Sequence, residues 1–129
     1  MATQPVNPKP SSRTHASVSL TTAADGTSES INLTGLTLSC VQMSTDWTDA
    51  GLGFKASVDG STNFYSVYDT AGNFLTYQTS ASRVVAFDPA VFAGIQRLQL
   101  VSQTTAGVAV AQAAARTLVL GLSEYVTAD

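Results

Sequence analysis

The stretch GLGFKASVDGSTNFYSVYD, residues 51–69, carries two strand patterns joined by one turn. In its first half, apolar and polar side chains alternate, and this period of two is typical of a β-strand with one buried face. The apolar face predicted for this strand consists of Leu52, Phe54, Ala56 and Val58. Asp59-Gly60 is the strongest turn signal of the chain, and residues 64–69 follow it as the second strand of a hairpin.

Further β-rich runs lie on both sides of this hairpin, separated by turn residues at the spacing typical of a sandwich or barrel. The expected strands are residues 16–20, 29–33, 36–43, 51–58, 64–69, 74–79, 82–87, 95–102 and 116–122. The three central runs are expected to form a meander. Asp88-Pro89 predicts the start of a short helix that Gly94 ends.

One segment, GVAVAQAAA at residues 107–115, permits two interpretations. Alanine favours an amphipathic helix, whereas the lack of charge and of a clear cap favours a loop packed on a neighbouring subunit. The loop is our prediction.

The fold class expected from these runs is all-β. We predict a single antiparallel β-sandwich, jelly-roll-like or immunoglobulin-like, with about eight or nine strands. The chain has 129 residues, which suffice for one cored domain and are too few for two. The sandwich is expected to span residues 15–129.

The first fourteen residues, MATQPVNPKPSSRT, differ from all that follows. Proline fixes φ and removes an amide donor, so this segment is unsuited to a helix or a central strand. We predict an extended N-terminal arm over residues 1–14 that anchors the protein to a partner. Its expected contact residues are Pro5, Val6, Pro8, Lys9, Pro10 and Arg13, with Arg97 and Arg116 as weaker partner-binding candidates.

Composition argues against several classes of partner. The net charge is −3 and the six basic residues are scattered, so we expect no nucleic-acid binding. No stretch approaches the roughly 20 apolar residues of a membrane span, and no secretory signal is recognisable, so we expect no membrane contact and synthesis in the host cytoplasm. Cys40 is the sole cysteine and is predicted to be a buried, inert thiol.

Residues for catalysis or metal binding are sparse. His15 is the single histidine, and a zinc site needs several His or Cys ligands. We therefore predict no enzymatic activity, no catalytic residue, no metal and no cofactor. The aspartates permit a calcium site or a glycosidase pair as alternatives, but aspartate is also a common turn residue. They are Asp46, Asp49, Asp59 and Asp69.

The aromatic residues leave one binding alternative open. Trp47 is a candidate ligand-facing aromatic, and together with Tyr65, Tyr68 and Tyr77 it could form a platform for stacking sugars. Aromatic residues within strands are more often core or cross-strand partners. A carbohydrate-binding module for host or surface adhesion is thus the alternative function.

Residues 28–122 resemble small virion proteins of tailed bacteriophages. The shared pattern is a tryptophan loop, an F-x-x-S-x-DG-S-x-x-F hairpin, a DPxxFxG turn and a strand that ends in serine. It consists here of Trp47, Phe54, Ser57, Asp59, Gly60, Ser61, Phe64, Asp88, Pro89, Phe92, Gly94 and Ser102. The hairpin also resembles that of discoidin-like sugar-binding domains.

The phage resemblance implies a capsid decoration, or cement, protein on the exterior of the virion. Such a protein is a β-sandwich that bridges adjacent major capsid protein subunits and stabilises the lattice. The resemblance implies no catalytic residues. A head-completion or tail structural role is a further alternative. Exposed strand edges favour self-association as a dimer or trimer.

Overall fold

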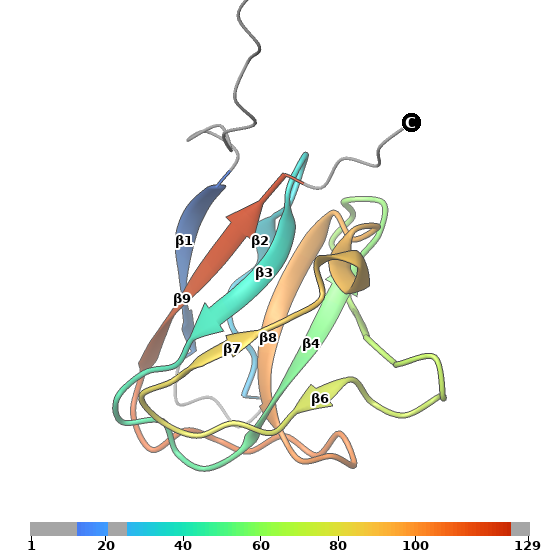
Figure 1. The fold of residues 1–129 in the computed structure, drawn as a ribbon. Coiled ribbons are helices and arrows are strands. Elements are labelled where there is room, and N and C mark those ends of the chain that lie inside the picture. The colour runs from blue at the N-terminus through green and yellow to red at the C-terminus, as the bar shows by residue number, and fades with distance from the viewer. Residues whose placement is uncertain (1–12, 21–25, 125–129) are drawn as a thin grey trace, which may run out of the picture.

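The computed structural model describes residues 13–20 and 26–124 of the chain. These residues form two antiparallel sheets packed face to face, so the predicted all-β sandwich is confirmed (Figure 1). The first sheet has the strand order β1-β9-β3-β7, and the second has the order β2-β8-β4-β5, with β6 also paired to β4. The strands are β1 Arg13–Leu20, β2 Ile31–Asn32, β3 Thr37–Gln42, β4 Gly51–Ser57, β5 Tyr65–Ser66, β6 Thr76–Tyr77, β7 Val84–Ala86, β8 Arg97–Gln103 and β9 Arg116–Ser123.

The core between the sheets is built from leucines around one group of aromatic rings. Phe54 of β4 lies at the centre of this group, with the rings of Phe92, Phe87 and Tyr77 at centroid distances of 4.9, 5.7 and 6.0 Å. The edge-on contacts between these rings are favourable beyond the burial of their area. The fully buried leucines that surround them are Leu20, Leu33, Leu38, Leu52, Leu98, Leu100, Leu118 and Leu120.

The central hairpin is confirmed, but the expected meander is not. Lys55 and Ala56 of β4 pair with β5 across the Asp59-Gly60 turn, where Gly60 has the positive φ of 80° that glycine adopts readily. The chain then returns to β4 rather than continuing outward, and β6 pairs with Leu52 and Gly53. Both β5 and β6 therefore line one edge of β4 in succession.

Strand β3 does not keep one alternation of buried and exposed faces along its length. Its register with β9 shifts between Leu38 and Cys40, which is the mark of a β-bulge at Ser39. The extra residue reverses the faces, so Val41 is buried while Cys40 is only half-buried. The prediction of a buried thiol at Cys40 was wrong for this reason.

The element after β7 forms as predicted. It is a single 3-10 turn, η2, over Pro89–Phe92, and the Asp88 side chain caps it by accepting a hydrogen bond from the Ala90 amide at 3.0 Å. Residues 107–115 form no helix, in agreement with the loop interpretation.

The boundary between arm and sandwich lies earlier than expected. Arg13 and Thr14, assigned to the arm from sequence, belong to β1 and pair with Ser123 and Leu122 of β9. Neither residue is a proline, so the ladder extends past the predicted boundary at residue 15. The other arm candidates, Pro5, Val6, Pro8, Lys9 and Pro10, lie outside the described residues.

Candidate functional site

The start of β1, the end of β9 and η2 meet at one end of the sandwich, which we call the open end. Arg13 pairs with Ser123, and Ser123 in turn pairs with Thr37 of β3. The Thr37 hydroxyl donates a hydrogen bond to the Pro89 carbonyl of η2 at 2.7 Å. The first described residue of the chain, Arg13, thus lies at this end of the sandwich, where β1 begins (Figure 1).

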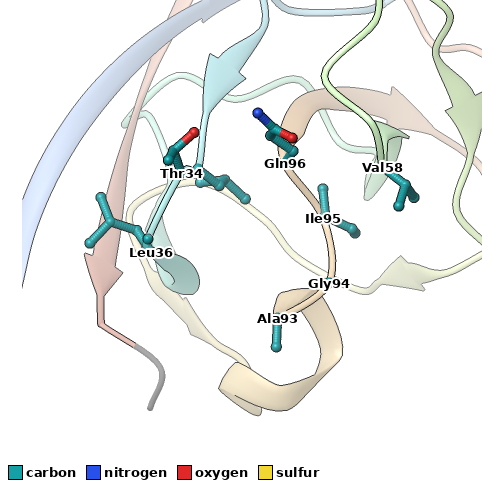
Figure 2. Close-up of a pocket in the computed structure, with 9 residues that line it drawn as sticks. Thr34, Leu36, Val58, Ala93, Gly94, Ile95 and Gln96 are labelled. Carbon is teal, nitrogen blue, oxygen red and sulfur yellow. The ribbon is translucent and has the colours of Figure 1, made fainter.

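Two neighbouring hollows lie at the open end. The first, of about 340 Å³, lies between the loop after β2, the residue after β4 and the turn after η2. Figure 2 shows Thr34 and Leu36 on one side of it, Val58 on the other, and Ala93 to Gln96 between them. Its backbone is held by hydrogen bonds from the Leu33 amide to the Gln96 carbonyl at 2.6 Å and from the Gln96 amide to the Ser57 carbonyl at 3.2 Å.

The second hollow, of about 560 Å³, is lined by the end of β4, the 59–63 loop and β5. Val58 and Ile95 line both hollows, so the two form one surface that we call the end groove. Val58 is 71% exposed and Tyr65, which lines the second hollow, is 74% exposed. Exposed apolar side chains grouped beside a groove are typical of surfaces that bind another molecule.

Asp59 supplies the negative charge of the end groove. The Ser61 backbone amide donates to its carboxylate at 3.0 Å, and the Ser57 hydroxyl donates at 3.2 Å. These hydrogen bonds, with that of the Ser61 amide foremost, hold the pKa of Asp59 below its usual value. The carboxylate is therefore ionised at neutral pH and suited to a basic group of a partner.

Arg97 lies next to the groove but is held by its own chain. It pairs with Ser57 across β8 and β4, and its Nη2 donates to the Ser30 hydroxyl at 2.9 Å. Its guanidinium carbon lies 5.9 Å from the centre of the Phe64 ring, and its buried Nε finds no hydrogen-bond partner among the described residues. Arg97, a weaker partner-binding candidate, therefore lies beside the groove, and its guanidinium is held by contacts within the chain.

Arg116 lies at the opposite end, which we call the latched end, and is not a surface contact. It is 6% exposed, and its Nη1 is 2.9 Å from the Asp46 carboxylate. Its Nε donates to Gln112 at 3.2 Å and its Nη2 to the Thr48 hydroxyl at 3.2 Å. Arg116 was predicted as a weaker partner-binding candidate, but these groups hold its guanidinium within the fold and leave little of it exposed.

Trp47 is also at the latched end and does not face a ligand. It is 4% exposed within the core, and its Nε1 donates to the Ala50 carbonyl at 3.1 Å. Tyr77 packs in the aromatic core, and Tyr68 stacks on Phe74 at 4.6 Å. Of the predicted sugar platform, Tyr65 alone lines the end groove.

The end groove was not predicted from the sequence, because β4 was expected to continue to Val58 and ends at Ser57. Val58 was expected on the core face with Leu52, but β4 ends at Ser57, which is itself buried. The turn then directs Val58 outward. An apolar residue directly before a strong Asp-Gly turn was the one signal that pointed to it.

No family model, no curated protein and no solved structure matched this chain when it was compared with each. Within residues 13–20 and 26–124, no three His, Cys, Asp or Glu side chains gather closely enough to hold a metal ion. No helix in the same residues is long and apolar enough to cross a membrane.

Proposed function

We propose that this protein is a non-enzymatic structural component of a tailed-phage virion that decorates the capsid exterior and bridges adjacent major capsid protein subunits. The observation that carries the proposal is the position of the end groove. Its exposed Val58 and Tyr65 lie at the end of the sandwich where the N-terminal segment is attached. Contacts from the groove and from that segment would therefore fall on neighbouring parts of one partner surface.

The groove has the chemistry of a protein-docking surface. It combines exposed apolar side chains with the Asp59 carboxylate and with serine and asparagine side chains at its rim. Apolar contact at the centre with polar groups around it is the usual arrangement of protein interfaces. A clamp that binds only the assembled lattice stabilises that lattice by mass action.

The first test is the number of copies of this chain per major capsid subunit in purified virions, measured by quantitative mass spectrometry. A ratio near one, or a simple fraction of one, is the expected result. A handful of copies would assign the protein to the neck or tail instead, and its absence from virions would overturn the proposal.

The second test is binding to capsids that lack the protein, measured by co-sedimentation. Val58→Asp is expected to weaken binding, because a charge would enter the apolar part of the groove. Val84→Asp is the matched control, since Val84 is 60% exposed on β7, away from the groove. Equal binding by the two variants would remove the groove from the interface.

A carbohydrate-binding role is the second candidate, and one observation favours it. The exposed Tyr65 ring lies beside Asp59, Ser61 and Asn63 in the second hollow, and an aromatic face next to carboxylate and amide groups suits a sugar. Glycan binding that is lost in Tyr65→Ala, with no effect of Tyr68→Ala, would favour this role.

A further inference from the structure

Among the residues that the structure describes, one of the two edges of strand β1 is almost unpaired. Its eight residues pair on one side with β9, without a break in register. On the other side, the single pairing in the described part of the chain is an isolated bridge between Leu20 and Ser28. Natural proteins usually protect such edges with lysine, proline or a bulge, because unpaired amides and carbonyls recruit further strands. The strand RTHASVSL contains no lysine, proline or bulge, and its arginine, Arg13, lies at its first residue.

The direction of the open amides follows from one hydrogen bond. The Ser19 amide donates to the Glu29 carboxylate at 3.3 Å and therefore points away from β9. In an antiparallel ladder, amides alternate between the two edges of a strand. The amides of Arg13, His15 and Ser17 consequently point outward as well and offer donors to another strand.

Both limits of this open edge are defined. At one limit, Ser28 lies beside Leu20 and blocks the approach of another strand. At the other, β1 begins at Arg13, and Pro10 in the preceding segment has no amide to donate. Among the described residues, the open edge therefore runs over residues 13–19, and its midpoint is Ala16.

We infer that two copies of this chain pair through β1, antiparallel, about a two-fold axis at Ala16. With Ala16 opposite Ala16, the whole open edge is paired, and His15 lies opposite the partner's Ser17. The register also places Arg13 opposite the partner's Ser19. The two four-stranded sheets would then join into one continuous sheet across the dimer.

Charge complementarity selects a second copy as the occupant. The exposed edge has a cation at one limit, Arg13, and an anion at the other, Glu29. Antiparallel self-pairing brings each Arg13 to the partner's Glu29, which would release the Ser19 amide to the new ladder. Because the axis relates the two ends, the pair forms twice.

The exposure of the side chains on the core face of β1 independently supports the same register. Val18 and Leu20 on the core face of β1 are buried, whereas Thr14 on that face is exposed and Ala16 is half-buried. Pairing at Ala16 would place Thr14 beside the partner's Val18 and cover both open positions. This inference does not rest on the proposed capsid role, since it concerns the free protein.

Disulfide trapping tests the register directly. Ala16→Cys in a Cys40→Ser background is expected to form a cross-linked dimer on mild oxidation, because directly opposite residues have Cβ atoms about 5 Å apart. Val84→Cys, on the far edge of the same sheet, is the control for random collision. Equal rates for the two variants would overturn the inference. Cross-linking of Ala16→Cys to capsid subunits, with a monomeric free protein, would overturn it in favour of a heterologous strand.

Light scattering with charge-swapped variants tests the pairing without cysteines. The wild-type protein is expected to dimerise, and Arg13→Glu to weaken dimerisation about tenfold, since two exposed ion pairs become repulsive. Adding Glu29→Arg to that variant is expected to restore the wild-type constant. Wild-type protein that stays monomeric at its highest soluble concentration, or a double variant as weak as the single one, would contradict the self-pairing.

Discussion

The two ends of the sandwich differ in how their side chains are paired and exposed. At the latched end, buried Gln112 accepts from the Thr48 amide at 2.8 Å and donates to Ser102 at 2.8 Å, while Arg116 joins it to Asp46. At the open end, Val58 and Tyr65 are exposed beside hollows, and Arg97 retains a buried Nε with no partner among the described residues.

This difference indicates that the latched end contributes to stability and the open end to binding. A buried polar network holds its loops rigidly when each of its members has a partner. Exposed apolar groups beside a groove contribute little to folding and become useful when a partner covers them. We therefore expect substitutions at the latched end to lower the free energy of unfolding, and those at the open end to affect binding.

The largest effect is expected for Arg116→Ala. The change removes the donors to Gln112 and Thr48 and leaves a space at a position that is 6% exposed. Loss of about 2–4 kcal/mol of unfolding free energy is expected, measured by urea denaturation. Arg97→Ala, the matched arginine near the open end, should cost clearly less. Equal losses of unfolding free energy in the two variants would contradict the proposed difference in stability between the two ends.

A smaller loss, about 1–2 kcal/mol, is expected for Gln112→Ala, because hydrogen bonds to Thr48 and Ser102 disappear together. The measurement that sharpens the comparison is a double-mutant cycle with Arg116→Ala. A coupling of at least about 0.5 kcal/mol would establish one network. If the losses of the two single variants simply add, Gln112 and Arg116 contribute to stability independently.

Acid should weaken both ends. The pKa of Asp46 is lowered, first by the hydrogen bond from Ser44 and then by the charge of Arg116, and that of Asp59 is lowered mainly by the Ser61 amide. A depressed pKa gives stability that is full above the usual value of 3.8 and declines as the pH falls through the lower, folded value. Thermal melts at falling pH should show less loss in Asp46→Asn and in Asp59→Asn than in the wild type. An unchanged acid profile in both variants would contradict this account.

The smallest effect on stability is expected for Val58→Asp, below about 0.5 kcal/mol, since its side chain is 71% exposed. The check is the midpoint of urea denaturation beside that of Val84→Asp. A large loss would show that the end groove is part of the core, and the co-sedimentation result would then reflect unfolding.

Periodicity predicted much of this fold because β4 and its hairpin follow local rules. Leu52 and Phe54 lie on alternate positions, separated by Gly53 and followed by Lys55, and the hairpin turns at Asp59-Gly60 as expected. The bulge at Ser39 was not predictable, because it is fixed by pairing with β9, some eighty positions later in the chain. Such a shift depends on tertiary contacts and leaves no mark in the local pattern.

The functional surfaces were less predictable than the strands. Arg116 and Trp47 have residue types common at interfaces, yet both are buried by loops that only the tertiary structure brings together. Gly53 shows the same limit: a Cβ there would lie 2.2 Å from the Gln103 side chain, so the glycine admits a buried amide rather than merely bending the strand. A sequence shows residue type, whereas a site depends on the neighbours.

The pairing of β1 with β9 has a consequence for the order of folding. These strands lie at opposite ends of the described chain, so their ladder closes a loop of nearly the whole domain. Contacts of such long sequence separation slow folding, because chain entropy is lost before the contacts form. During synthesis, β1 must wait for β9 to be made, so the edge that β9 covers stays unpaired until then. The sheet that contains β1 is therefore expected to form late in folding, once β9 is available to pair with it.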